Sequence, residues 1–152
     1  MTLITRWWFV RHAPVPGMKG LLYGSSDVAC DTSDTEAFHS LAKKLPSNAI
    51  LLTSHLSRTL ETAAAIKAAG LSAPEPNIEK GICEQNFGDW QQLSWDQMEK
   101  KDPKAYLTFW EAPARNAPPS GESFLDVIKR TAKVLDKYTK IHAGRDIIAI
   151  CH

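Results

Sequence analysis

Residues 6–12 read Arg-Trp-Trp-Phe-Val-Arg-His, an apolar run that ends on an arginine and a histidine. Aromatic and β-branched residues of this kind are typical of a β-strand, and we predict one over residues 6–10. Open parallel sheets bind ligands at the carboxyl ends of their strands, where Arg11 and His12 would lie. A guanidinium fits phosphate and an imidazole can act as a nucleophile. The pair therefore predicts phosphate chemistry.

The rest of the chain alternates between apolar β-type runs and helical patterns. This alternation predicts an α/β fold of three layers, with a mainly parallel central sheet. The 152 residues form one domain, 1–152. No helix follows the last predicted strand, so we expect the domain to lack its C-terminal part. Further strands are expected at 49–53, 77–82 and 146–151, and helices at 34–45, 57–69, 95–101, 103–110 and 123–138.

Composition limits the classes of partner. The net charge is +1 and the charge runs are short pairs, so neither nucleic acid nor a membrane is an expected partner. No apolar stretch approaches the roughly 20 residues that span a bilayer. Three scattered cysteines and the lack of a signal peptide indicate a cytoplasmic protein with reduced thiols. No zinc-type spacing or glycine-rich nucleotide loop is present, so we predict no metal and no cofactor.

Polar residues follow each of the other predicted strands. Arg58 follows the second, Glu84 the third and His152 the last. Taken singly, Arg58 could be an ordinary helix-face residue and Glu84 an ordinary loop carboxylate. Together at one rim they would support phosphoryl transfer. Cations would bind the phosphoryl group, and a carboxylic acid would protonate the leaving oxygen.

Several segments, taken in order, resemble the histidine phosphatase superfamily, whose fold is phosphoglycerate mutase-like. The likeness covers essentially the whole chain, and small α-ribazole phosphatase-like members look most similar. The segments that carry it are Val10-Arg11-His12, Tyr23-Gly24-Ser25-Ser26-Asp27, Ser54-His55-Leu56-Ser57-Arg58, Glu84-Gln85-Asn86-Phe87-Gly88-Asp89-Trp90, Gly121-Glu122-Ser123 and Cys151-His152.

The resemblance implies a role for each candidate residue. His12 would be the phosphorylated nucleophile, and Glu84 the proton donor and later the base for water. His152 would complete the catalytic set by gripping the phosphoryl group. The substrate-binding residues would be Arg11, Arg58, Tyr23 and Asp27.

The chain departs from the family pattern in three places. Ala13 stands where glycine is usual, which we expect to be tolerated if its φ stays negative. His55 replaces a common proline, as a surface residue or a further polar group at the rim. In the family a glycine usually follows the last histidine of the pattern, whereas this sequence ends at His152. The terminal carboxylate of His152 would oppose phosphate binding.

The expected function is a metal-independent phosphatase that acts through a phosphohistidine intermediate on a small phosphorylated metabolite, with α-ribazole 5′-phosphate as a candidate. A mutase-type phosphotransferase is the alternative. It is less favoured because mutases resembling this family usually carry longer insertions between Glu84 and Gly121. A non-catalytic phosphate-binding or interaction module is expected if the chain truly ends at His152. An exposed sheet edge would favour a homodimer.

Overall fold

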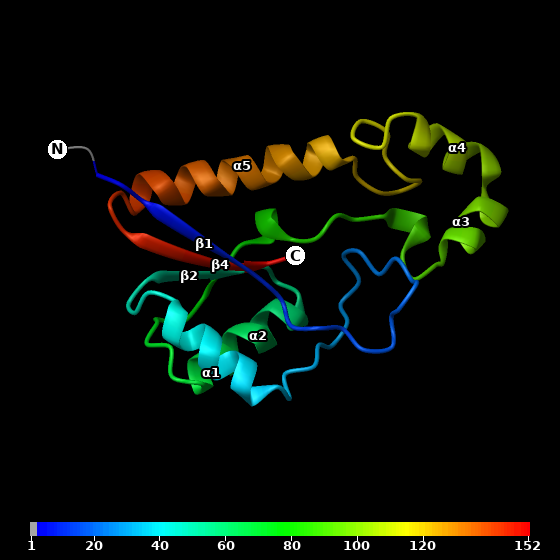
Figure 1. Cartoon of the computed structure of the whole chain (residues 1–152). Coiled ribbons are helices and arrows are strands. Elements are labelled where there is room, and N and C mark those ends of the chain that lie inside the picture. The colour runs from blue at the N-terminus through cyan, green and yellow to red at the C-terminus, as the bar shows by residue number, and fades with distance from the viewer. Residues whose placement is uncertain (1–2) are drawn as a thin grey trace.

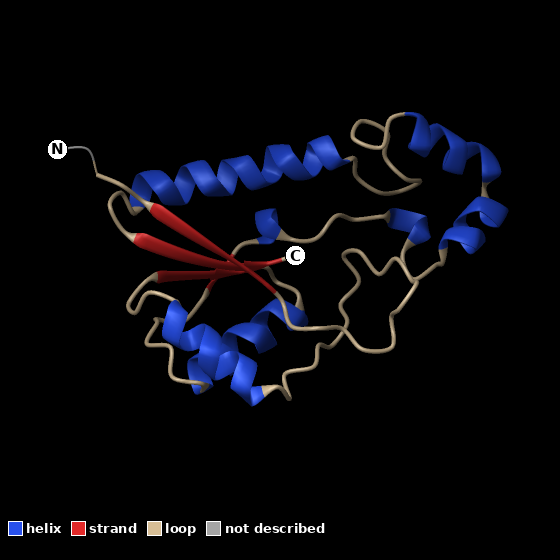
Figure 2. Ribbon diagram, in the orientation of Figure 1, coloured by secondary structure: helices blue, strands red, loops and turns tan. Residues whose placement is uncertain are grey.

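The computed structural model describes residues 3–152 and is built around one four-stranded sheet (Figure 2). All its strand pairings are parallel, as predicted. The order across the sheet is β1-β4-β2-β3. The C-terminal strand therefore lies between the first and second strands. The strands are β1 (Arg6–Arg11), β2 (Ile50–Thr53), β3 (Asn77–Ile78) and β4 (Asp146–Cys151).

Helices cover both faces of the sheet, which confirms the three-layer prediction (Figure 1). Helices α1 (Thr35–Lys44) and α2 (Ser57–Ala68) lie on one face, and α5 (Phe124–Ile141) lies on the other. Alternate β4 side chains serve the two layers: Ile148 packs with the α1/α2 core and Ile147 with the α5 core. Burying both faces is the reason that β4 is continuously apolar.

Local capping signals determine where several helices begin. Ser94 and Ser123 each form a capping box, which starts α3 (Trp95–Lys101) and α5. Pro103 occupies the first turn of α4 (Pro103–Glu111), where its missing N–H costs nothing. Helices α3 and α4 form a lobe at one end of the sheet, seen on the right of Figure 1. The lobe has its own small core of Trp90, Met98 and Phe109.

The prediction of a strand over 77–82 was too long. Strand β3 covers only Asn77–Ile78, and the 3₁₀ turn η1 (Lys80–Ile82) follows. The chain turns because Gly81 lies directly against α5: a Cβ there would meet Val134 Cγ2 at 2.5 Å. Arg130 and Thr131 of α5 also donate hydrogen bonds to the Gly81 carbonyl, which fixes the turn. Helix α5 itself runs to Ile141, three residues beyond its predicted end.

Strand β1 forms one edge of the sheet. Its side chains Trp8 and Phe9 are 37% and 60% exposed. Trp7, by contrast, packs partly against the α5 core. Within residues 3–152 no helix combines the length and the apolar character needed to cross a bilayer.

Candidate active site

The register of β1 and β4 brings two histidines together. Arg11 pairs with Cys151, so His12 and His152 follow side by side at the carboxyl edge of the sheet. The backbone N–H of His12 donates to the Cys151 carbonyl at 2.9 Å. The two imidazole centroids are 5.2 Å apart and their planes are tilted by 55°. Residues 140 positions apart thus form one pair because the strands that carry them are neighbours.

His12 presents one unpartnered nitrogen. Its Nδ1 lies 2.7 Å from the Ala13 carbonyl oxygen, which can only accept, so Nδ1 carries the proton. Its Nε2 is buried and has no hydrogen-bond partner among residues 3–152. Burial, helped by the charges of Arg58 and Arg11, lowers the pKa of His12 below its usual 6.5. Near neutral pH the ring is therefore uncharged, with a free Nε2 lone pair, which is the form a nucleophile needs.

Arg58 is held in place by backbone. Its side chain is fully buried, and its two terminal nitrogens donate to the carbonyls of Gly24 and Ser26, both at 2.8 Å. The guanidinium carbon lies 5.3 Å from the centre of the Tyr23 ring, in a cation–π arrangement. Arg58 therefore carries a fixed positive charge next to the two histidines, in the first turn of α2.

His152, unlike His12, is hydrogen-bonded at both ring nitrogens. Nδ1 accepts from Arg58 Nε at 3.2 Å, and Nε2 lies 2.9 Å from the Ser54 hydroxyl. Burial first, and then the charge of Arg58, lower the pKa of His152 to about 3. The ring is neutral in this arrangement. To donate to a phosphoryl oxygen, its Nε2–H would have to leave Ser54.

Glu84 lies on the wall of a cavity of about 340 Å³, and it is close enough to His12 for its charge to offset part of the lowering of the pKa of that imidazole by burial. One of its carboxylate oxygens accepts from the Gln85 backbone N–H at 2.8 Å. Its backbone carbonyl accepts from Arg130 Nη2 at 3.1 Å, which ties this loop to α5. A carboxyl group in this place borders the space that a leaving group would fill.

The remaining predicted substrate-binding residues differ in position. Arg11 is exposed at the end of β1, and it lines a second cavity of about 450 Å³ together with His12. Tyr23 reaches the site through its ring beneath Arg58. Asp27 is engaged elsewhere: both its oxygens accept from Ser57, at 2.8 Å from the backbone N–H and 2.8 Å from the hydroxyl. It thereby anchors its loop to the first turn of α2.

Two supporting residues were missed by the sequence reasoning. Ser54 orients His152, and its hydroxyl also lies 3.0 Å from that of Thr59. Thr62 accepts from the Ala13 N–H at 2.8 Å and so fixes the residue that holds the His12 ring. Thr62 is four residues after Arg58 on α2, and this helical spacing is the one signal that could have indicated it. Ala13 does not have a positive φ, so the condition for tolerating alanine at this position is met.

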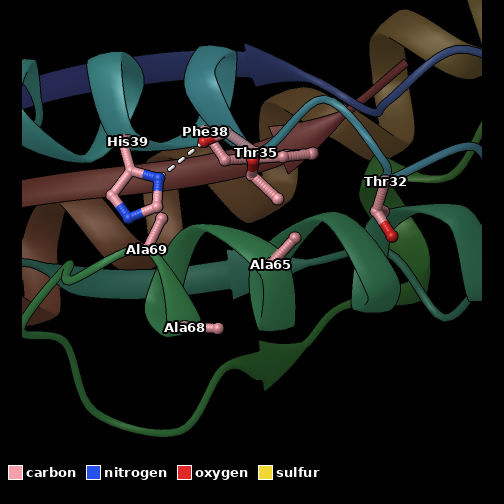
Figure 3. Close-up of a pocket in the computed structure, with 7 residues that line it drawn as sticks. All are labelled: Thr32, Thr35, Phe38, His39, Ala65, Ala68 and Ala69. Carbon is pink, nitrogen blue, oxygen red and sulfur yellow. Dashed lines mark hydrogen bonds between the residues drawn. The ribbon is translucent and has the colours of Figure 1, made fainter.

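A further cavity of about 270 Å³ lies between α1 and α2, and Figure 3 shows its lining. Ala65 and Ala68 of α2, with Ala69 directly after the helix, line it together with Phe38 and His39 of α1. His39 Nδ1 is hydrogen-bonded to the Thr35 carbonyl at 2.6 Å, within its own helix. Neither arginine nor lysine lines this cavity, so it lacks the fixed positive charge that Arg58 supplies at the two histidines.

The chain is similar to known proteins in both sequence and fold. The model of the histidine phosphatase superfamily (branch 1) matches residues 7–152. The metal-independent phosphoserine phosphatase of Arabidopsis thaliana is 31% identical over 101 residues, or 66% of this chain and 42% of that protein. The glucosyl-3-phosphoglycerate phosphatase of Mycolicibacterium vanbaalenii is 35% identical over 91 residues, or 60% of this chain and 38% of that protein.

The crystal structure of the α-ribazole phosphatase from Shigella flexneri has the same fold. It superposes with a TM-score of 0.81 at 21% identity, over 96% of this chain and 73% of that chain. The matched region spans 27–42% of the length of the curated relatives it matches.

Proposed function

The chain belongs to the histidine phosphatase superfamily, and from that premise we propose that it is a metal-independent phosphomonoesterase that works through phosphohistidine. The observation that carries the proposal is the buried, unpartnered Nε2 of His12, in a neutral ring beside the fixed charge of Arg58. This nitrogen can attack phosphorus without first losing a proton.

The first half of the reaction transfers the phosphoryl group to the protein. The Nε2 lone pair of His12 bonds to phosphorus as the bond from phosphorus to the ester oxygen breaks. Arg58 and Arg11 stabilise the charge on the phosphoryl oxygens. The Glu84 carboxyl gives its proton to the departing oxygen, which leaves as an alcohol.

The second half regenerates the enzyme. The Glu84 carboxylate takes a proton from water, and the water oxygen bonds to phosphorus while the bond to Nε2 breaks. Inorganic phosphate leaves, His12 is again neutral and Glu84 is again protonated. His152 joins either step once its Nε2–H turns from Ser54 to a phosphoryl oxygen.

The substrate class is a small phosphorylated metabolite, and α-ribazole 5′-phosphate is the specific candidate. The resemblance to α-ribazole phosphatases supports that candidate at the level of fold. Phosphoserine and glucosyl-3-phosphoglycerate, in the names of two relatives, extend the panel to test. The expected cytoplasmic location remains a prediction. So does a homodimer formed through the β1 edge, which light scattering at high concentration would test.

The decisive experiment traps the intermediate. Protein mixed with a phosphomonoester and quenched in alkali should carry an acid-labile phosphate on His12, detected by ³¹P NMR and mass spectrometry. His12→Ala should abolish both labelling and turnover. The matched control is His39→Ala, at an exposed histidine outside the site, which should retain both. Turnover by His12→Ala, or a label on another residue, would refute the mechanism.

A further inference from the structure

We infer that the alcohol released from the substrate carries a carboxylate, which Lys80 and His55 bind in the cavity beside Glu84. This inference rests on the proposed phosphatase function and narrows its substrate class to phosphomonoesters of hydroxy acids, which disfavours α-ribazole 5′-phosphate because the alcohol it releases has no carboxylate. The cavity is the one on whose wall Glu84 lies, and its volume is about 340 Å³. Because Glu84 protonates the leaving oxygen, the rest of the leaving group must lie next to it, in this cavity.

The cavity suits a polar ligand. In addition to His55 and Glu84 it is lined by Ser25, Lys80, Cys83, Asn86, Gly121, Glu122 and Arg130. By contrast, the groove of similar size beside α4 is lined by aromatic rings, Phe87, Trp95, Phe109 and Trp110. A neutral apolar leaving group would be better accommodated by the aromatic groove than by this cavity.

Two of the charged side chains around the cavity, Arg130 and Glu122, are paired with each other. Arg130 donates to both oxygens of Glu122, at 3.0 and 2.7 Å, in a two-point ion pair. Glu122 also accepts from the Asn86 backbone N–H at 2.9 Å. This pair therefore contributes little net charge to a ligand. In the proposed mechanism Glu84 brings the proton that the leaving oxygen takes up.

Two other side chains at the cavity, those of Lys80 and His55, take no part in an ion pair of this kind within the part of the chain that the structure describes. Lys80 has no carboxylate within 4.0 Å among residues 3–152. The neighbouring Glu79 is engaged by Lys137 of α5 at 2.6 Å. Likewise Asp27, the acid near His55, is bonded through both oxygens to Ser57. The cavity thus has two cationic or donor groups with no acidic partner of their own.

The donor set suits a carboxylate. The Asn86 side-chain oxygen accepts from the Gly88 N–H at 2.8 Å, which leaves its amide NH₂ as a further donor at the cavity wall. An ammonium, an imidazole and an amide offer fewer fixed donors than the two guanidinium groups at the phosphate site. We therefore assign the cavity to a singly charged carboxylate and the guanidinium site to the phosphoryl group.

The assignment also explains product release. Glu84 becomes a carboxylate when it gives up its proton, and it then shares the cavity with the carboxylate of the new alcohol. The two negative charges in one cavity repel each other, which favours departure of the alcohol before water attacks.

Two phosphomonoesters of matched size test the inference: phosphoglycolate, whose alcohol carries a carboxylate, and 2-hydroxyethyl phosphate, whose alcohol is neutral. We expect kcat/KM to favour phosphoglycolate by about tenfold. Lys80→Met should reduce this ratio about fivefold, largely through KM, and His55→Gln should reduce it in the same direction. The control Lys104→Met, on the distant α4, should leave the ratio unchanged.

Calorimetric binding of the two esters to the inactive His12→Ala variant gives a readout that does not depend on turnover, and phosphoglycolate should bind more tightly. A ratio near one, or a ratio that Lys80→Met and His55→Gln do not move, would overturn this inference while the phosphatase function stands. Binding of both esters with equal affinity would overturn it as well. Failure to hydrolyse either ester, with no phosphate on His12, would instead overturn the proposed function.

Discussion

Arg58 donates its Nε–H to Nδ1 of His152 across 3.2 Å, so the guanidinium decides which nitrogen of the imidazole carries the proton. Because Nδ1 accepts, Nε2 holds the hydrogen and donates it to the Ser54 hydroxyl at 2.9 Å. The phosphate site therefore contains two neutral imidazoles, those of His12 and His152, and takes its positive charge from arginine.

This arrangement predicts a loss of stability in acid. Unfolded His152 takes up a proton as the pH falls through about 6.5, whereas folded His152 does so only near pH 3. The unfolded chain thus binds more protons in between, and the free energy of unfolding falls with the pH there. Above the pKa that His152 has in the unfolded chain, its contribution to the free energy of unfolding is fully retained. Urea unfolding across this range should show the slope.

The variant His152→Gln should make that slope shallower, because the titrating ring is gone. His39→Gln, at an exposed position on α1, is the matched control and should keep the wild-type slope. Identical slopes in wild type and His152→Gln would rule out this account.

Glu84→Gln should slow hydrolysis in proportion to the need of the leaving group for a proton. We expect a loss of about a hundredfold for an alkyl phosphate and a much smaller loss for nitrophenyl phosphate. Steady-state kinetics with both substrates measure this, with Glu99→Gln on the exposed face of α3 as control. An equal loss for both substrates would argue against the proton-donor role.

Arg58→Lys should weaken phosphate binding strongly. An ammonium cannot reach the Gly24 and Ser26 carbonyls and His152 together, as the planar guanidinium does. Vanadate or phosphate binding should fall by more than tenfold, and the free energy of unfolding by about 2–3 kcal/mol, since buried carbonyls lose their donors. Arg115→Lys, at an exposed position, should change neither. Wild-type affinity in Arg58→Lys would contradict this view of the site.

Asp27→Ala tests whether this carboxylate anchors its loop or binds substrate. The bonds to Ser57 predict a loss of about 1 kcal/mol in unfolding free energy, as for other lost caps. Asp136→Ala, on the exposed face of α5, provides the comparison. A large fall in kcat/KM with no change in stability would instead support the substrate-binding role.

The sequence predicted those parts of the fold that depend on local signals. The helices expected over 95–101 and 123–138 are present, and capping boxes at Ser94 and Ser123 begin them. The apolar run before His152 is the strand that its composition predicted. The shortened third strand was not predictable, because the turn at Gly81 depends on close contact with Val134, more than fifty residues later.

The same distinction applies to the site. Strand ends could be expected to bring His12, Arg58 and His152 together, since parallel strands share one rim. The partners that hold these groups could not be predicted. Arg58 bonds to backbone carbonyls, which every residue possesses, and so its anchors at Gly24 and Ser26 leave no trace in side-chain pattern.

The Gly24 and Ser26 carbonyls that hold Arg58 divide the loop between β1 and α1 into two parts. We expect the two parts to tolerate sequence changes during evolution to different extents. At Gly17 and Gly20 an added Cβ would meet nothing within 4 Å, so packing does not oppose insertions beside them, although their φ angles of 75° and 79° favour glycine at these two positions themselves. At Gly24 a Cβ would meet the Gln85 carbonyl oxygen at 2.8 Å. The backbone carbonyls of Gly24 and Ser26 also orient Arg58. Length changes among related chains should therefore accumulate before Leu22 and be rare between Tyr23 and Asp27.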